Sequence, residues 1–243
     1  MPEDAKRGAG HRRSSRAGGG ACGRAARRLR LSQDPGRFAS AFLPAFAYSG
    51  AQPHLLPVVE RARIVDLYAG RVGGYFRDPR RIAPHNLYAH TSQLLAGAPG
   101  ASTAHDIGFR FGPAPAGGRP VASLTVSYRA ASFMFRWSAA DRRWLVWMDG
   151  RPAAAAEGGQ LGAPTVVIQY TTVRTSRFRE EGTRPPYAES TGTGTGVVLR
   201  GGKAYTIRWS RPDASGGTTF TTTTGGAMTF ARGQVWVVLA GAP

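Results

Sequence analysis

The sequence predicts an α+β fold in which a mixed helix and strand segment precedes a β-rich, antiparallel part. Two observations carry this prediction. Gly (33) and Pro (17) are abundant among 243 residues, which favours many turns and short strands over long helices. Beyond Val121, apolar residues alternate with polar ones in short runs between Gly-rich turns, whereas upstream segments show helical spacing. A hydrophobic content of 42% is ordinary for a globular protein with a real core.

The first 37 residues differ in composition from the rest of the chain. They are rich in Ala, Gly and Arg, and ten Lys/Arg against three acidic residues give them a net charge of +7. Such a segment cannot bury enough apolar surface to offset chain entropy, so we expect residues 1–37 to be disordered. The abrupt change near Phe38 leaves an alternative open, namely that this basic segment is a non-native start of the kind that GC-rich DNA yields.

The next segment predicts a strand, two helices and two short strands. An apolar, aromatic run predicts a buried strand at Ala41–Ser49. Pro53 suits the first turn of a helix that runs toward Ala69, and we expect its end, Ile64–Tyr68, to leave the helix as a short strand. Tyr75–Arg77 predicts a brief strand, and a second helix is expected to open at Pro84 and to stop at Gly97.

Residues 97–120 form a Gly/Pro/Ala-rich connection, which is the best candidate for a domain boundary. We therefore divide the chain into a basic segment 1–37, an α/β part 38–120 and a β-rich part 121–243. Thr165–Thr172 is apolar and β-branched, which predicts a central strand. The regular spacing of strands indicates an antiparallel meander, sandwich or partial barrel. The other expected strands are Val121–Arg129, Phe133–Trp137, Trp144–Met148, Val197–Leu199, Ala204–Trp209, Thr218–Thr223, Ala227–Phe230 and Val235–Leu239.

The formal net charge of +18 suggests an anionic partner, and +11 of it lies outside the basic segment. Only Lys6 and Lys203 are lysines, so part of the basicity reflects the codon usage of a GC-rich genome, and specific nucleic-acid binding is not expected. Cys22 is the only cysteine, which excludes an intrachain disulfide. The chain as written shows neither an apolar run long enough for a transmembrane helix nor a signal peptide, which by itself predicts a cytoplasmic location.

The segment Phe76–His90 holds the densest polar chemistry of the chain. A functional interpretation is a ligand site in which arginines bind an anion and His85 acts as an acid, base or donor. In the structural interpretation, which we favour, Asp78 pairs with an arginine, and His85 and Asn86 fix a turn. The candidate ligand-binding residues are Arg77, Asp78, Arg81, His85, Asn86 and Tyr88.

Other catalytic and cofactor patterns are weak. His85 and His90 are five residues apart and would not share a helical face, so we expect no metal site, and we expect no cofactor. Thr191–Gly196 resembles a phosphate-binding loop but precedes a strand, so we interpret it as a flexible turn. No catalytic residue can be assigned. Five aromatic residues lie among arginines and form either a stacking surface or, as we favour, a core: Phe133, Phe135, Trp137, Trp144 and Trp147.

Several segments together resemble the YerB family of predicted bacterial lipoproteins, over roughly Phe38 to Pro243. The block Phe76–Ala89, FRDPRRIAPHNLYA, is the most specific of them. The others are Phe46–Pro53, Phe135–Pro152, Thr165–Val173 and Ala231–Leu239. The resemblance implies an N-terminal α/β domain of unknown function, a smaller β-rich C-terminal domain and an extracytoplasmic, membrane-anchored location. Because the basic segment stands where the family has a signal peptide and the start of its first domain, we expect the α/β part to be incomplete and export to be in question.

The expected function is that of an uncharacterised, extracytoplasmic binding or structural protein of the bacterial cell envelope. Its basic surface would engage an anionic cell-wall polymer or lipid headgroups. One alternative is an enzyme acting on an envelope component through Asp78, His85 and Tyr88. Another is a non-specific nucleic-acid binder, which the total charge suggests.

Overall fold

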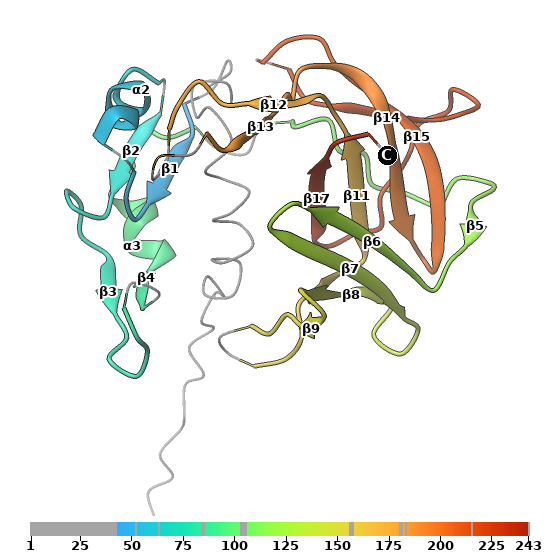
Figure 1. Ribbon diagram of the computed structural model, residues 1–243, viewed down its shortest axis with the longest axis horizontal. Helices are drawn as coiled ribbons and strands as arrows, with labels where there is room; N and C mark the ends of the chain where they lie inside the picture. The colour runs from blue at the N-terminus through green and yellow to red at the C-terminus, as the bar shows by residue number, and fades with distance from the viewer. Residues whose placement is uncertain are drawn as a thin grey trace, which may run out of the picture.

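Two β-sheets pack face to face in the second half of the chain (Figure 1). The computed structural model describes residues 43–242 except 52, 63, 84–85, 103–105, 156–157, 180–181, 183 and 215, so the prediction for residues 1–37 lies outside the described residues. The first sheet has the order β10-β8-β7-β6, with β9 paired to β8. Its strands are β6 Ser123–Tyr128, β7 Ala131–Ser138, β8 Arg143–Met148, β9 Arg151–Pro152 and β10 Gly162–Ala163.

The second sheet has the order β16-β15-β14-β11-β17, with β5 paired to β15. A separate hairpin, β12–β13, extends from this sheet toward the part of the chain that precedes the two sheets (Figure 1). The strands are β5 Arg119–Pro120, β11 Thr165–Tyr170, β12 Val173–Thr175, β13 Pro186–Ala188, β14 Gly192–Arg200, β15 Lys203–Arg211, β16 Thr219–Thr222 and β17 Val235–Ala240. The described chain is therefore β-rich with mainly antiparallel sheets, as the sequence predicts.

The main core lies between the two sheets. Phe135 and Trp144 of the first sheet and Val166 and Ile168 of the second are among its fully buried residues. A smaller core behind the second sheet contains Phe230. Because β11 contributes to both cores, almost all of its residues are buried, which explains the consecutive apolar residues Val166–Ile168 at its centre.

A smaller unit precedes the two sheets and lies to one side of them in Figure 1. In it, β1 Ala45–Tyr48 and β2 Val65–Tyr68 pair in parallel. They are joined through a 3-10 turn at Pro53–Leu55 and the helix α2 Leu56–Glu60. The antiparallel pair β3 Tyr75–Arg77 and β4 Leu87–Ala89 follows, and then the helix α3 Thr91–Ala96. The small core of this unit is built on Leu67, Leu94 and Ala98.

Several elements differ from the sequence prediction. The helix expected from Pro84 to Gly97 is shorter, because Leu87–Ala89 pairs with β3 and only Thr91–Ala96 is helical. Pro84 itself lies outside the described residues. The expected strand Ala227–Phe230 contributes only isolated bridges. β17 pairs with β11 in parallel, because the chain returns to β11 only after completing the β14–β15–β16 meander.

The expected flexible turn at Thr191–Gly196 is also wrong, because β14 begins at Gly192 and includes the glycines. Packing overrides the poor strand propensity of glycine here. A Cβ at Gly194 would lie 2.7 Å from Trp209 Nε1, and a Cβ at Gly196 would collide with the Ile168 carbonyl. The alternating glycines therefore let β14 lie close to its neighbours.

Candidate functional site

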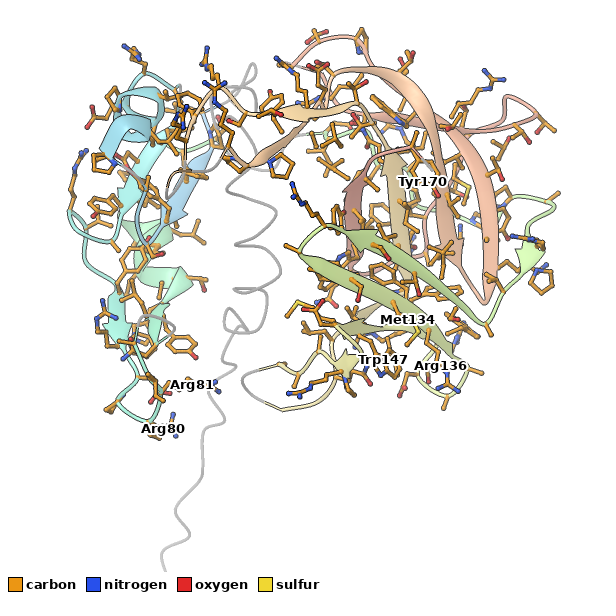
Figure 2. The ribbon with its side chains drawn as sticks, viewed as in Figure 1. Arg80, Arg81, Met134, Arg136, Trp147 and Tyr170 are labelled. Atoms are coloured by element: carbon orange, nitrogen blue, oxygen red, sulfur yellow. The ribbon has the colours of Figure 1, made fainter. Side chains whose placement is uncertain are left out.

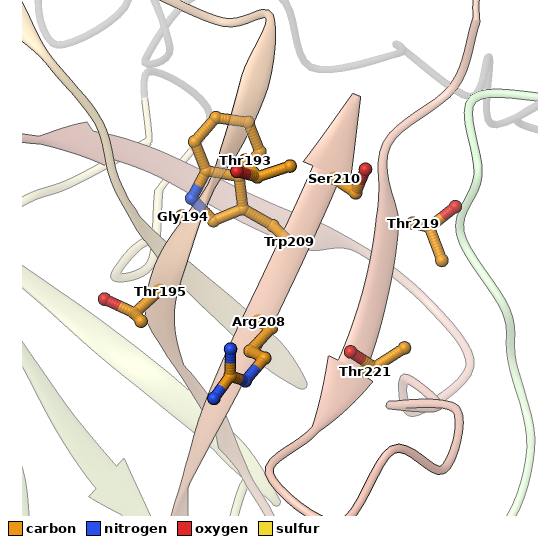
Figure 3. Close-up of a pocket in the computed structure, with 8 residues that line it drawn as sticks. All are labelled: Thr193, Gly194, Thr195, Arg208, Trp209, Ser210, Thr219 and Thr221. Carbon is orange, nitrogen blue, oxygen red and sulfur yellow. The ribbon is translucent and has the colours of Figure 1, made fainter. Parts of the chain in front are cut away.

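An open groove of about 440 Å³ lies on strands β14, β15 and β16 (Figure 3). The antiparallel register places hydroxyl side chains opposite one another across the three strands. One row is formed by Thr193, Ser210 and Thr219. The next row has Thr195 and Thr221 on either side of Arg208. The groove therefore presents five hydroxyl groups around one guanidinium.

The groove continues the face of β14 and β15 that forms the main core. Val197 and Leu199 on β14 and Ala204 on β15 pack against the core between the sheets. Two residues further along β14 from Val197, the same face carries Thr195 and then Thr193. The side chains thus change from apolar to hydroxyl-bearing along one strand face, at the point where the first sheet no longer covers it.

The indole of Trp209 supports the groove from below. It is 3% exposed, and its Nε1 donates a hydrogen bond to the Tyr170 carbonyl at 2.8 Å. Its ring lies against Gly194, where any larger residue would collide with it. The groove is therefore a fixed part of the sheet, and a ligand would meet a surface that is already ordered.

Arg208 differs from its two arginine neighbours in the second sheet. Arg200 donates to the carbonyls of Gly112 and Thr229, and Arg211 donates to those of Ala214 and Gly216. Burial lowers the pKa of both of these guanidinium groups. These two arginines hold loops to the sheet.

By contrast, Arg208 is exposed, and none of the ion pairs among the described residues involves it. The residues that line the groove include no carboxylate. A guanidinium with hydroxyl neighbours binds phosphate, sulfate or carboxylate groups through charge-assisted hydrogen bonds. The groove lining also contains no His or Cys.

The ligand site predicted from the sequence lies elsewhere, on the β3–β4 hairpin. Asp78 Oδ1 accepts hydrogen bonds of 3.0 Å from the backbone N and Nε of Arg80, and its other oxygen lies 4.0 Å from Arg81 Nε. The hydrogen bonds from Arg80 lower the pKa of Asp78. Arg77 donates to the side chain of Asn86 at 2.6 Å. The contact between Asp78 and Arg80 is of the kind that the structural interpretation assigns to Asp78. Asn86 instead accepts its shorter bond from a side chain, and its own bond to the backbone, to the Asp78 carbonyl, is 3.5 Å long.

Tyr88 lies on strand β4 of this hairpin. It pairs with Phe76 across the two strands, and their rings stack at 5.8 Å. Phe76 also stacks on His90 at 4.5 Å. His85 lies outside the described residues. The structure thus brings Arg77, Asp78, Arg81 and Asn86 together and places Tyr88 in an aromatic cluster.

The aromatic residues of the β7–β8 hairpin divide between the two faces of their sheet. Phe133, Phe135 and Trp144 are at most 3% exposed, so the core interpretation is confirmed for them. Trp137 is partly buried and packs against Trp144 at 5.3 Å. Trp147 lies opposite Met134 in the register and is half-buried (Figure 2).

The described residues contain no cluster of three or more His, Cys, Asp or Glu side chains arranged to hold a metal ion. No helix in this part of the chain has the length and apolarity needed to cross a membrane.

The fold and the groove define the class of protein, which is a β-rich domain of two packed sheets beside a small helix-containing unit. Residues 124–237 match the family described as "Protein of unknown function (DUF3048) C-terminal domain". The crystal structure of the YerB protein from Bacillus subtilis is similar, with a TM-score of 0.66 over 85% of this chain and 71% of that chain, at 13% identity. No match was found among curated proteins. The chain therefore contains a YerB-like domain of unknown function, which confirms the resemblance found in the sequence.

Proposed function

We propose that this protein is a binding protein of the bacterial envelope, and that the β14–β15–β16 groove binds an anionic, hydroxyl-rich cell-wall polymer. The observation that carries the proposal is the exposed Arg208 guanidinium, which has a hydroxyl group on either side and a row of three further hydroxyl groups next to it. Such a ligand needs one cationic partner for each negative group and hydroxyl partners for the groups between the charges. The groove offers both kinds of partner on one ordered surface.

The dimensions of the groove suit a short stretch of a linear polymer. Neighbouring strands lie about 4.8 Å apart, so the distance from β14 to β16 is about 10 Å. Rows along a strand face repeat about every 7 Å. One or two polyol-phosphate or acidic sugar units would fill this area. The net charge of +11 outside residues 1–37 would raise the local concentration of such a polymer.

The proposed experiment is calorimetric titration of the full chain with a poly(glycerol phosphate) at low salt, with neutral dextran as the comparison. Arg208→Gln should weaken binding by about ten-fold, because hydrogen bonds to a charged group contribute about 1.5 kcal/mol or more. Arg129→Gln is the matched control, since Arg129 is also exposed but follows β6 in a turn of the first sheet. The affinity of the Arg129→Gln variant for the polymer should change by less than two-fold.

Two results would contradict this site. If Arg208→Gln and Arg129→Gln reduced the affinity for the polymer equally, only the overall charge of the protein would attract the polymer. Equal affinity for double-stranded DNA, with the same steep salt dependence, would favour the non-specific nucleic-acid alternative.

We propose an extracytoplasmic, membrane-anchored location on the basis of the family resemblance. A tagged protein expressed from its native locus should fractionate with the envelope and be digested by protease added to spheroplasts. Protection from that protease, together with recovery in the cytoplasmic fraction, would contradict this location.

We also infer that residues 38–120 belong to an α/β domain of which this chain holds a part. The parallel β1–β2 pair joined through α2 supports the inference, because parallel strands need such a crossover. A two-stranded sheet is marginal by itself, so further strands are expected beside it. Extending the chain upstream in its genome should raise the melting temperature of this unit, and an unchanged value would argue against the inference.

A further inference from the structure

The β3–β4 hairpin ends in a tip, residues 78–83, that exposes an apolar side chain next to arginines. Ile82 is 89% exposed, more than any other large hydrophobic residue among the described residues. The side chains of Arg80 and Arg81 are 83% and 44% exposed. Figure 2 shows both arginines at the far end of the hairpin, away from its two strands.

We propose that this tip contacts an anionic lipid bilayer, with Ile82 inserted among the acyl chains and Arg80 and Arg81 bound to headgroup phosphates. A single exposed apolar residue is common on protein surfaces and carries no such meaning alone. Its position at a protruding tip next to two arginines is what fits a bilayer, where hydrocarbon lies directly beneath a layer of anionic groups.

The charge of the tip complements that of anionic lipids. Residues 78–83 contain two arginines and one carboxylate, which leaves a net charge of +1, and Arg77 at the end of β3 adds a further positive charge. Asp78 binds the Nε of Arg80 through Oδ1 at 3.0 Å and the Nη2 through Oδ2 at 3.1 Å, but Arg81 is only loosely paired at 4.0 Å. Arg81 is therefore the more available partner for a phosphate.

The backbone of the tip is held in place before any ligand binds. The Asp78 N–H donates to the Asn86 carbonyl at 2.8 Å, and the Arg81 N–H donates to the Asp78 carbonyl at 3.2 Å. Asn86 is buried and holds the Arg77 guanidinium. Because these hydrogen bonds already hold the backbone at Asp78 and Arg81, little conformational entropy is lost there when the tip contacts a surface.

The strands above the tip carry aromatic groups on one face. Phe76 is 42% exposed and stacks with Tyr88 and His90. Aromatic side chains are enriched at the level of lipid headgroups, because their rings are amphipathic. The hairpin thus carries an apolar residue at its tip, arginines beside that residue and aromatic rings above them. This order matches the layers of a bilayer surface, where hydrocarbon lies beneath the headgroups.

The test compares binding of the full chain to vesicles with about one-third phosphatidylglycerol in phosphatidylcholine and to vesicles of phosphatidylcholine alone. Ile82→Ser, which leaves the charge unchanged, should lower the partition coefficient on anionic vesicles about ten-fold, from the loss of apolar burial. Arg81→Gln should lower it about five-fold, and Asp78→Asn should raise it by a similar factor.

The control is Ile107→Ser, because Ile107 is a half-exposed apolar residue in the connection that packs on the β-rich part. It should bind as the unmodified chain does. An environment-sensitive dye on Ile82→Cys, in a Cys22→Ser background, should shift to the blue with anionic vesicles, whereas the same dye on Ile107→Cys should not.

The proposal is overturned if Ile82→Ser binds as tightly as the unmodified chain, or if the dye at position 82 does not shift. Either result would mean that only the basic surface attracts the vesicles. This test is independent of the polymer-binding proposal, because Arg208→Gln should leave the vesicle affinity unchanged while it weakens polymer binding.

Discussion

The packing of Trp209 beneath Gly194 leads to a sharp prediction about the stability of the groove. In the variant Gly194→Ala, the new Cβ would lie 2.7 Å from Trp209 Nε1 and 3.0 Å from the Tyr170 carbonyl oxygen. Trp209 is buried, so its ring can move only by displacing its neighbours. The ring would also lose its 2.8 Å hydrogen bond to Tyr170.

The expected cost of Gly194→Ala follows from two effects. Overpacking a filled core costs about 1–3 kcal/mol, and loss of a buried hydrogen bond costs about 1 kcal/mol more. The free energy of unfolding should therefore fall by about 2–4 kcal/mol. With a urea dependence of about 2 kcal/mol per molar, the midpoint would fall by about 1–2 M.

The assay is urea unfolding followed by tryptophan fluorescence, with Gly226→Ala as the control. A Cβ at Gly226 meets only the Thr222 hydroxyl at an ordinary 3.5 Å, so this variant should be nearly neutral. Gly194→Ala should also cost at least 1 kcal/mol less in a Trp209→Phe background, because the colliding Nε1 is then absent. Equal midpoints for Gly194→Ala and Gly226→Ala would refute the reasoning.

Two further predictions concern polar groups of the β-rich part. Arg200→Gln should destabilise the fold by about 2–4 kcal/mol, because it removes charge-assisted hydrogen bonds to the carbonyls of Gly112 and Thr229. Arg208→Gln should leave the urea midpoint unchanged, and similar midpoints for the two variants would contradict this difference. Burial raises the pKa of Tyr128 to about 12, so the stability that this tyrosine contributes is present below pH 10 and lost as the pH rises toward 12. Tyr128→Phe should weaken the alkaline loss of stability measured by urea unfolding between these pH values, and an unchanged loss would contradict the assignment.

The β-rich part could be predicted because its sequence pattern follows directly from burial. β7 and β8 have one face in the core, so burial alternates along them, whereas β11 is buried on both faces and has the apolar run Val166–Ile168 at its centre. Strand β4 was missed because three residues carry too little periodicity to separate a strand from the first turn of a helix. Its pairing with β3 across a nine-residue loop is tertiary information that a local pattern does not contain.

The ligand site that was predicted on the β3–β4 hairpin shows a different limit on what a sequence can predict. The sequence correctly indicates that charged residues gather around Asp78, but it does not show which groups bind one another. Asp78 bonds to Arg80, two residues away, and Arg77 bonds to Asn86 across the hairpin. Even with these pairs formed, the side chains of Arg80 and Arg81 stay exposed. Ile82, which is exposed beside them, has no place in an interpretation based on polar chemistry.

The groove could not be found from the sequence for a related reason. Its hydroxyl rows draw on three strands, and their alignment depends on the register set by the turn at Gly201 and Gly202, whose φ angles of 55° and 73° suit glycine. The run Thr191–Gly196 contains the signal, since its threonines alternate with glycines and thus share one face. In the sequence alone, the glycines between these threonines indicate a flexible backbone. In the structure, the glycine at position 194 lets the backbone of β14 lie directly against the ring of Trp209. The same residues that argue against a strand by propensity are therefore the ones that let the indole support a hydroxyl surface around Arg208.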